Sequence, residues 1–374
     1  MSQPRLIQRA IRQNPAIRKY ITKDLLIELV STFVPVMCPT FDSMMQSISL
    51  LSSGGSETLS LVLPNFIPPT TVLPEVEVFI FTTIVTTLLR EKLDNQAASA
   101  VTILIERIRS FNRRSLDLIS SKAFLYFSLA FEKINQLENI RPMLLTLYRT
   151  ASIRHDEMGQ SVLLNLILRN YLQYNLIEQA QTLSLRTTFP EGASNNQFCR
   201  YLYYMGRIQA IQLEYSSSFQ RLVMAARKAP QDVGVGFTVV VQKLSIIVQL
   251  LMGDIPERAV FNVPEHRVAL QPYLAITQAV RNGDLQLFDA TVAKFGSTFK
   301  ADKNFSLVMR LGHNVLKTGL RKISLSYSRI TLVDVAAKLH LPSASSAEYI
   351  CAKSIRFVDV CCLMSMYFII ILSD

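Results

Sequence analysis

The chain has 374 residues, which is long enough to bury a large core without disulfides or metals, and 49% of its residues are hydrophobic. Its five cysteines (Cys38, Cys199, Cys351, Cys361 and Cys362) include no Cys-x-x-Cys pair and an odd one, which argues against a secreted disulfide scaffold and favours a reducing compartment. The formal net charge is +11, and part of it is concentrated at the N-terminus.

The N-terminal segment, residues 1–30, is predicted to be a basic helical arm. Residues 1–23 contain no acid and six cations, which are Arg5, Arg9, Arg12, Arg18, Lys19 and Lys23. Such an arm suits an acidic protein or a nucleic acid, and the alternative is a solvated helix face. The charged start is not followed by an apolar core of signal-peptide length, so we expect no cleavable signal peptide.

Residues 31–73 indicate an irregular linker because they are rich in Pro, Ser, Thr and Gly, including Ser52–Ser56 and Pro68–Pro69. From Pro74 onward the pattern becomes helical, and we assign residues 74–300 to a helical repeat region. The stretch Val78–Leu89 is apolar apart from threonines. Its twelve residues fall short of the roughly 20 that cross a bilayer, so it is predicted to be a buried helix.

A repeat of helix pairs is indicated within residues 74–300. Small or apolar residues open the second helix of each candidate pair at Ala97, Ile140, Ala180 and Phe219, which gives spacings of 43, 40 and 39 residues by subtraction. The run Gly283–Phe288 repeats the same turn later in the chain. A period of about 40 residues is typical of stacked, TPR-like helical hairpins. The alternative is an irregular helical domain; either arrangement offers long surfaces that suit protein binding.

Residues 301–356 predict the opening of a winged helix. A long helix from Asn304 to Ile323 is followed by Ser324–Ile330, whose alternation of apolar and small polar residues suits a half-buried strand. Thr331 is predicted to cap the next helix, and Pro342 to end it. A last helix then starts at Ser345 or Ser346 and turns four side chains inward, which are Ala347, Ile350, Cys351 and Ile355.

The quoted segments also resemble a known family. The run Arg310–Arg321 followed by Ile323–Ile330 is similar to the PCI domain of the third non-ATPase subunit of the 26S proteasome regulatory particle. Upstream segments agree with it, namely Arg149–Gln160, Leu163–Tyr171, Arg200–Tyr204 and Ala226–Pro230. The resemblance covers roughly residues 74–356. It ends at Arg356, where the family continues with wing strands and a long bundle helix, and Gly312 replaces an arginine that is usual in the family.

The resemblance implies a mainly α protein: a TPR-like helical-hairpin solenoid followed by a truncated winged-helix PCI module. It further implies a non-catalytic scaffold of the proteasome lid, in the cytoplasm and nucleus, with other lid PCI subunits as partners in a hetero-oligomer and no cofactor. The alternatives are a PCI adaptor of another complex, such as the signalosome or a translation initiation factor, and a nucleic-acid-associated PCI protein.

The C-terminal residues 357–374 read as a divergent hydrophobic tail. Their apolar run Phe357–Leu372 contains Asp359 and is sixteen residues long, so a membrane anchor is the less favoured interpretation. We expect this tail to be a poor substitute for an amphipathic bundle helix, because it does not separate an apolar face from a charged one.

Catalytic, metal and cofactor sites are not indicated. The four histidines (His155, His266, His313 and His340) have no ligand spacing, and the run His155–Glu157 reads as the polar start of a helix. Neither a phosphate-binding GxxxxGK[ST] loop nor a Gly-x-Ser-x-Gly elbow occurs, and Val233–Phe237 lacks the third glycine of a dinucleotide site. We therefore predict no enzymatic activity and no small-molecule substrate.

The candidate binding residues lie in and after the long C-terminal helix. They combine charge, amide and aromatic side chains away from its apolar face, and they are His313, Asn314, Lys317, Arg321, Tyr327 and Arg329. A DNA-reading helix should expose cations and amides, whereas the last helix offers Glu348, which would oppose phosphate. Protein contact is therefore favoured over nucleic acid, and a solvated surface is the alternative for the charged residues.

Overall fold

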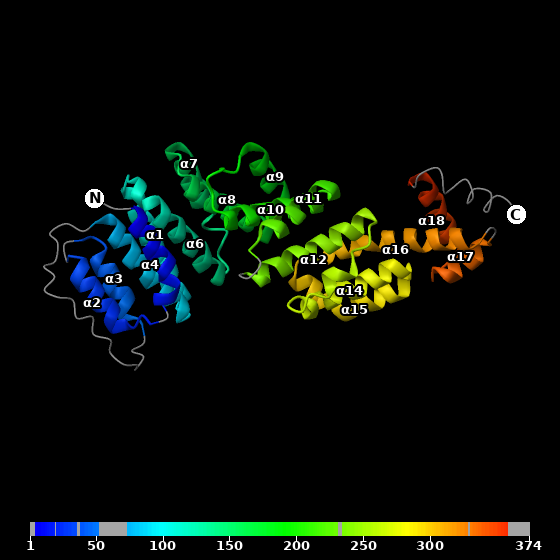
Figure 1. Ribbon diagram of the computed structural model, residues 1–374, viewed down its shortest axis with the longest axis horizontal. Helices are drawn as coiled ribbons and strands as arrows, with labels where there is room; N and C mark the ends of the chain where they lie inside the picture. Colours follow the sequence, from blue (N-terminus) through cyan, green and yellow to red (C-terminus); the bar gives the residue numbers. More distant parts are fainter. Residues whose placement is uncertain are drawn as a thin grey trace. The chain divides into compact units, whose positions relative to one another are not determined.

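The computed structural model describes the backbone of residues 4–18, 20–35, 38–51, 73–230, 234–327 and 330–357. The chain divides within α10 into two units, residues 1–198 and 199–374 (Figure 1). The first unit contains α1 (Pro4–Ile17), α2 (Lys23–Phe33), α3 (Phe41–Ser49), α4 (Pro74–Arg90), α5 (Asp94–Ser110), the 3-10 turn η1 (Arg114–Leu116), α6 (Asp117–Lys133), α7 (Arg141–Arg154), α8 (Glu157–Gln173) and α9 (Ile177–Arg186).

The second unit follows from α10 (Asn195–Ile211) and contains α11 (Tyr215–Lys228), α12 (Val235–Met252), α13 (Arg258–Phe261), α14 (Arg267–Asn282), α15 (Leu285–Ala301), α16 (Phe305–Ser326), α17 (Leu332–Lys338) and α18 (Ala344–Phe357). The described residues contain helices and no strand, so the mainly α fold class is confirmed.

Neighbouring helices pack against each other, as in a helical repeat, and the contacting pairs include α4 with α5, α7 with α8, α8 with α9 and α14 with α15. The predicted markers Ala97, Ile140, Ala180 and Phe219 fall at or near the starts of α5, α7, α9 and α11. Phe288 lies in the first turn of α15 in the same way. These markers were identified as small or apolar residues that open the second helix of each pair, and a shared turn geometry explains their regular spacing.

Five of the connections between helices turn through one residue in the left-handed region. These residues are Lys92, Asn135, Asn175, Leu213 and Gly283, with φ between 57° and 73°. The amide of the residue that follows donates back to a carbonyl five positions earlier, for example Gln136 to Phe131 (3.0 Å) and Leu176 to Tyr171 (2.9 Å). This is the closure in which a left-handed residue satisfies the last carbonyls of a helix. The marker lies five or six residues after each turn.

Two segments before and within the helical repeat region were predicted as a linker and as a buried helix. Residues 41–49, expected to be irregular, form α3, because Met44 and Ile48 are buried and the hydroxyl of Ser47 is satisfied by the carbonyl oxygen of Ser43 (2.7 Å). Val78–Leu89 was predicted to be a buried helix, and this is confirmed within α4.

The strand expected over Ser324–Ile330 is not formed in its described part, because α16 continues to Ser326. The hydroxyls of Ser324 and Ser326 donate to the carbonyl oxygens of Arg321 (2.8 Å) and Lys322 (2.9 Å), so the helix itself satisfies them. A strand would need a neighbouring strand for its backbone groups, and the described residues offer none. Tyr327, which follows the helix, is extended, and residues 328 and 329 lie outside the described residues.

Two helices follow α16, as predicted, but α17 ends at Lys338 before reaching Pro342, and α18 begins at Ala344 rather than at Ser345 or Ser346. The Thr331 side chain accepts from the Asp334 amide (3.2 Å) and caps α17, and α18 buries Ala347 and Cys351. These residues form one apolar cluster with Leu320 and Ile323 of α16. The predicted inward side chain Ile355 and the tail 358–374 fall outside the described side chains and residues.

In the described residues α12 is the one helix whose length and composition match a membrane span. Its Lys243 Nζ is bound to both carboxylate oxygens of Asp302 (3.0 and 2.8 Å), and Tyr273 donates to the same carboxylate (2.8 Å). A helix that holds an internal ion pair and packs against α11, α14 and α16 fits a core helix better than a lipid-facing one.

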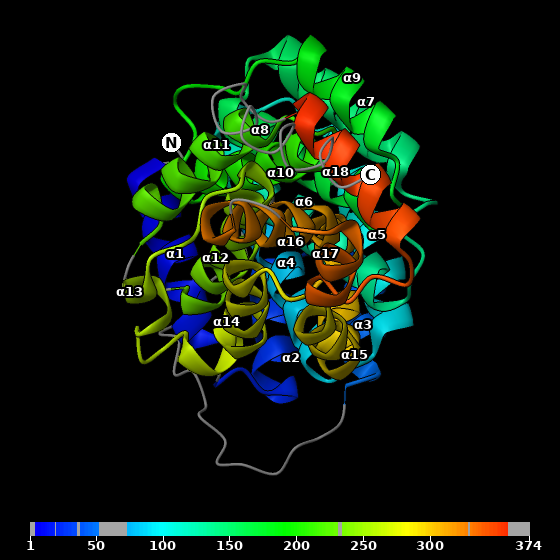
Figure 2. The same cartoon turned by 90° about the vertical axis from the view of Figure 1, so that its right-hand side faces the viewer.

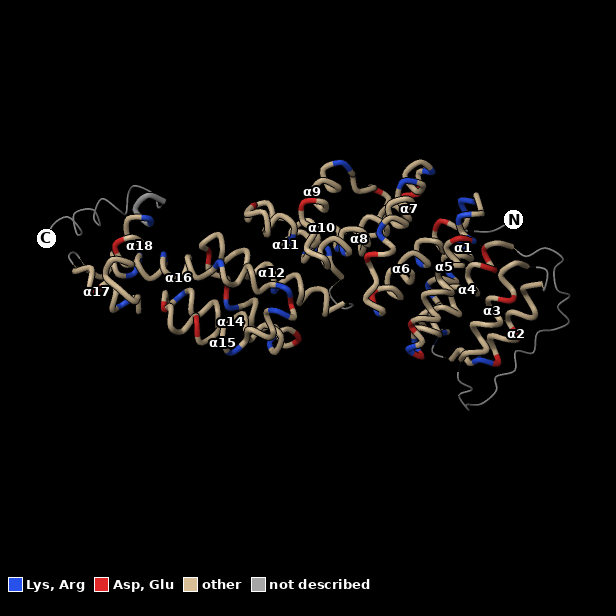
Figure 3. The backbone as a smooth tube through the Cα atoms, turned by 180° about the vertical axis from the view of Figure 1, so that it is seen from behind, with Lys and Arg blue, Asp and Glu red and all other residues tan. Residues whose placement is uncertain are grey.

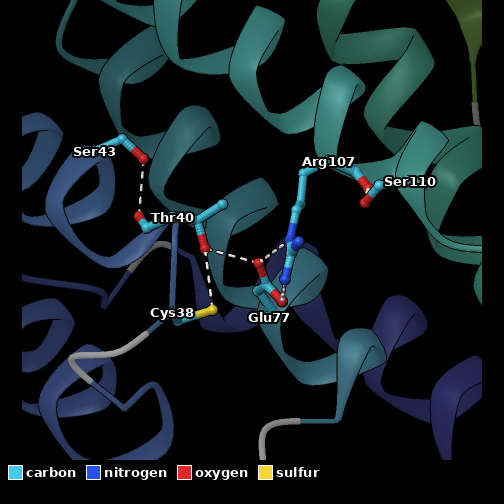
Figure 4. Close-up of polar contacts among 6 residues, drawn as sticks. All are labelled: Cys38, Thr40, Ser43, Glu77, Arg107 and Ser110. Atoms are coloured by element: carbon cyan, nitrogen blue, oxygen red, sulfur yellow. Dashed lines mark hydrogen bonds and ion pairs between the residues drawn. The ribbon is translucent and has the colours of Figure 1, made fainter.

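The first unit is joined internally by a buried polar cluster (Figure 4). Glu77 of α4 is almost fully buried, and its Oε1 accepts from Thr40 Oγ1 (2.7 Å) and from Arg107 Nε of α5 (2.8 Å). The hydrogen bond to Glu77 raises the pKa of Arg107 further above its usual value, so the guanidinium stays charged. This cluster connects the segment before α3 to α4 and α5.

Candidate protein interface

Helix α16 is the longest helix of the described residues and packs against α12, α14 and α15 in the second unit (Figure 2). Its buried stripe recurs at helical spacing and consists of Leu307, Val308, Leu311, Val315, Gly319, Leu320 and Ile323. The remaining side chains divide into those that bind other helices and those that face solvent, and this division decides which of the predicted interface residues are available.

Three polar side chains of α16 bind the C-terminal ends of earlier helices. Arg310 Nη1 donates to the Ile211 carbonyl of α10 (3.2 Å), and Lys322 Nζ donates to the Asn282 carbonyl of α14 (3.2 Å). Asn314 Nδ2 donates to the carbonyls of Leu250 (2.7 Å) and Leu251 (3.0 Å) of α12. The last carbonyls of a helix lack partners within the helix and carry its negative dipole end, so donors and cations are stabilising there.

Asn314 is therefore an internal contact, although the sequence placed it among the interface residues. Its amide donates to two carbonyls of α12, and a partner protein would have to break these bonds to use it. No local sequence pattern indicates this role, because the hydrogen bond joins residues 64 positions apart.

His313 is half-buried on α16, near cations of two helices. Burial lowers the pKa of its imidazole, and the charges of Lys317 and of Lys353 on α18 lower it further. The neutral form is thus favoured at pH 7, and His313 adds a hydrogen-bonding edge rather than a charge to this surface.

Lys317 is half-buried and Arg321 is exposed, and in the described part of the chain neither has a carboxylate within ion-pair distance. Tyr327 is exposed, and its hydroxyl accepts from Lys338 Nζ (2.9 Å), which also lies 4.7 Å from the ring centroid. Arg329 lies outside the described residues. Of the six predicted residues, the structure thus presents Lys317, Arg321 and Tyr327 to solvent.

Helices α16, α17 and α18 also expose large apolar side chains. Leu325 of α16 is 79% exposed, Val333 of α17 is 67% exposed and Tyr349 of α18 is 69% exposed. The sequence had assigned Leu325 to a half-buried strand; on the longer helix it falls away from the buried stripe. We define the C-terminal surface by six residues, which are Lys317, Arg321, Leu325, Tyr327, Val333 and Tyr349.

Groups suited to catalysis are sparse in the described residues, where no cluster of three His, Cys, Asp or Glu side chains is placed to hold a metal ion. The run His155–Glu157 is a polar helix start, as predicted, since the Asp156 side chain accepts from the Gly159 amide (2.9 Å) and caps α8. Burial and the neighbouring Asp156 raise the pKa of Asp117 to about 6. Burial also raises the pKa of Tyr273.

Comparison with known proteins places these features in a family. A family model described as "PSMD3-like, N-terminal TPR repeats" matches residues 1–277, and a PCI domain model matches residues 292–357. The chain is 43% identical over 356 residues to the 26S proteasome non-ATPase regulatory subunit 3 homolog B of Arabidopsis thaliana, covering 94% of this chain and 73% of that protein. The chain belongs to the 26S proteasome non-ATPase regulatory subunit 3 family.

Relatives from animals and fungi agree. The probable 26S proteasome non-ATPase regulatory subunit 3 of Anopheles gambiae is 44% identical over 354 residues, with 95% of this chain and 71% of the relative covered. The probable 26S proteasome regulatory subunit rpn3 of Schizosaccharomyces pombe is 43% identical over 354 residues, with 94% and 71% covered. In this chain of the subunit 3 family, the C-terminal surface lies entirely within the segment that matches the PCI domain.

Proposed function

We propose that the chain is a non-catalytic structural subunit of the 26S proteasome regulatory particle lid, in the cytoplasm and nucleus. It would hold neighbouring PCI subunits in place for ubiquitin-dependent protein degradation. The family membership supports the assembly, and the names of the relatives, which describe non-ATPase regulatory subunits, support the absence of ATP hydrolysis.

The observation that carries this proposal is the composition of the C-terminal surface. Leu325 of α16, Val333 of α17 and Tyr349 of α18 are exposed apolar side chains. Arg321 lies near the C-terminal end of α16, and Tyr327 directly follows this helix. Aromatic residues and arginine beside apolar side chains are typical of protein–protein interfaces, where a few such residues carry most of the binding free energy.

The charges of this region favour protein over nucleic acid. Asp334 on α17 and Glu348 on α18 are exposed and would repel phosphate groups. Lys317 and Arg321, in contrast, would find carboxylates or carbonyls on a protein partner. Arg329, which stands two residues after Tyr327, is proposed as a further contact, and His313 as a hydrogen-bonding residue at the edge.

The test is copurification with the other PCI subunits of the lid from the same organism. Arg321→Glu should weaken the affinity about tenfold or more, which corresponds to about 1.4 kcal/mol, because it places a like charge opposite a site that attracts a cation. The control is Arg258→Glu, which reverses an exposed arginine of the same unit outside the C-terminal surface. Circular dichroism should show unchanged helicity for both variants.

Wild-type binding by Arg321→Glu and by Leu325→Asp together would contradict the proposed surface. Mass spectrometry of the purified complexes separates the alternatives, since signalosome or initiation-factor subunits in place of lid subunits would contradict the proposed assembly. ATP hydrolysis or ubiquitin-chain cleavage that survives repurification of the chain would contradict the non-catalytic role.

A further inference from the structure

Helix α5 of the first unit ends in a strongly basic stretch. Four arginines lie between the last turn of α5 and the first residue of η1, and Figure 3 colours them blue along the backbone; they are Arg107, Arg109, Arg113 and Arg114. Ser110 stands between them as the last residue of α5. This serine is exposed, so an enzyme can reach it from solvent.

The backbone leaves the helix directly after Ser110. Phe111 (φ −93°, ψ 139°) and Arg113 (φ −131°, ψ 130°) both have extended conformations. The Ser110 hydroxyl donates to the Arg107 carbonyl (2.6 Å) within the last turn of α5 (Figure 4). The end of a helix opens at a smaller free-energy cost than its interior. A kinase, which has to align a hydroxyl with the γ-phosphate of ATP, therefore needs to unwind little of the chain at Ser110.

Ser115, five residues later, also follows arginines but is a poorer acceptor for a phosphate. Its hydroxyl donates to the carboxylate of the buried Glu75, and the serine itself is half-buried. A phosphate at this position would face a buried carboxylate, and like charges repel strongly where water is scarce. The hydrogen-bond partner of Ser110 is instead a backbone carbonyl. Burial and charge thus favour Ser110 of the two serines.

A phosphate on Ser110 would compete for cations that now pair with buried carboxylates. Arg107 pairs with Glu77 (2.8 Å), and Arg113 with Glu75 (3.8 Å). Residues three apart on a helix are neighbours, so the Arg107 guanidinium can reach a phosphate on Ser110 by a change of rotamer. Phosphoserine carries a charge of about −1.5 to −2 and three acceptor oxygens. The negative end of the α5 dipole opposes it with only about half a charge, which four arginines outweigh.

We propose that Ser110 is the acceptor site of a basophilic serine/threonine kinase, and that its phosphate draws Arg107 away from Glu77 and loosens the segment before α3 from α4 and α5. In the transfer the Ser110 oxygen bonds to the γ-phosphorus of ATP, and the bond from this phosphorus to the β–γ bridging oxygen breaks. ADP leaves, and the hydroxyl proton passes to the catalytic aspartate of the kinase. This inference does not rest on the proposed function.

The first test incubates the folded, intact chain with ATP and the catalytic subunit of cyclic-AMP-dependent protein kinase, which has an acidic substrate groove. Mass spectrometry should find a phosphate on Ser110. The matched control is Ser99 of the same helix, which is exposed and donates to the carbonyl three residues before it (2.9 Å), but has no lysine or arginine within six residues. Its phosphorylation should be at least tenfold slower. Arg109→Gln with Arg114→Gln should slow that of Ser110 about fivefold.

Hydrogen exchange tests the effect of the phosphate. In the phosphorylated chain the amides of residues 38–51 should exchange about tenfold faster than in the unmodified chain, and those of α16 should not change. Ser110→Ala, incubated with kinase and ATP in the same way, should match the unmodified chain, because the serine hydroxyl does not hold Arg107 against Glu77. Equal melting temperatures of Ser110→Ala and the wild type verify that the variant is folded.

The absence of a phosphate on Ser110, or its presence there only after the chain is unfolded, would overturn the proposal. Equally fast modification of Ser99 or Ser115 would overturn it as well. A phosphate on Ser110 that leaves the exchange of residues 38–51 unchanged would contradict the proposed effect on the fold. The C-terminal variant Arg321→Glu should be phosphorylated at the wild-type rate, so this test and that of the proposed function fail separately.

Discussion

Gly319 of α16 lies so close to Leu339 and to the Gly283 turn that there is no room for a Cβ atom. A Cβ atom built there would lie 2.6 Å from Leu339 Cδ2 and 2.8 Å from the carbonyl oxygen of Gly283. The second neighbour is backbone, in a turn where Gly283 has φ +68°, and it cannot rotate away. A glycine inside a helix destabilises it by about 1 kcal/mol relative to alanine. In α16 this loss accompanies the close approach of α17 and of the α14–α15 turn, which a larger residue would prevent.

Gly319→Ala should therefore lower the free energy of unfolding by about 1–3 kcal/mol, because overpacking outweighs the gain in helix propensity. The matched control is Gly296→Ala in α15, where an added Cβ meets no atom within 4 Å. That substitution should raise the free energy of unfolding by up to about 1 kcal/mol. Chemical denaturation followed by far-ultraviolet circular dichroism measures both, and equal effects of the two substitutions would contradict the packing argument.

At the scale of the element, α16 is held as much by its polar side chains as by its apolar stripe. Arg310, Asn314 and Lys322 bind the ends of α10, α12 and α14, and so fix the register of α16 against three helices. Lys317 lies between them in sequence but has no such partner in the described residues, which makes it a matched comparison.

Asn314→Ala should lower the free energy of unfolding by about 1–3 kcal/mol, since it removes the side-chain donor of the half-buried Leu251 carbonyl and leaves the Leu250 carbonyl with the Gly253 amide alone. Lys317→Ala should change it by less than about 0.5 kcal/mol, as is usual for surface positions. Thermal denaturation measures both. If Lys317→Ala were the more destabilising, our division of the polar face into internal and solvent-facing residues would be wrong.

The sequence predicts the helices of this chain better than their ends. Asn135, Asn175 and Gly283 mark their turns because asparagine and glycine tolerate positive φ, whereas Lys92 and Leu213 adopt the same conformation with no sequence signal. Seven alternating residues, Ser324–Ile330, predicted a strand wrongly, since short alternation cannot reveal that the serines are satisfied within a helix. For the interface, exposure of Arg321 and Tyr327 was predictable, and the internal role of Asn314 was not.

Part of the net charge of +11 comes from lysines and arginines whose side chains donate to the last carbonyls of neighbouring helices. In the first unit Lys23 Nζ donates to the carbonyls of Ser49 (3.0 Å) and Leu51 (2.9 Å) after α3, and Lys133 Nζ donates to the Leu89 carbonyl of α4 (2.9 Å). Arg310 and Lys322 do the same in the second unit. An all-helical chain has many negative dipole ends, and lysine or arginine from a neighbouring helix satisfies them.

The buried ion pair between Glu77 of α4 and Arg107 of α5 shares its carboxylate with Thr40, and so joins the segment before α3 to α4 and α5. Arg107→Met would leave the Glu77 carboxylate buried with Thr40 as its remaining donor. Removing one partner of a buried pair costs roughly 3–5 kcal/mol, and we expect about 2–4 kcal/mol here because the arginine side chain is 26% exposed.

The loss should be local, so hydrogen exchange should rise in residues 38–51, which Thr40 and Glu77 join to α4, and stay unchanged in α16. Arg109→Met, which removes an exposed arginine two positions along α5, is the control and should alter neither. The double variant Glu77→Gln with Arg107→Met should be less destabilised than Arg107→Met alone, because glutamine still accepts from Thr40 and leaves no buried charge. If the double variant were less stable than Arg107→Met alone, the unpaired charge of Glu77 would not be the cause of the loss in stability.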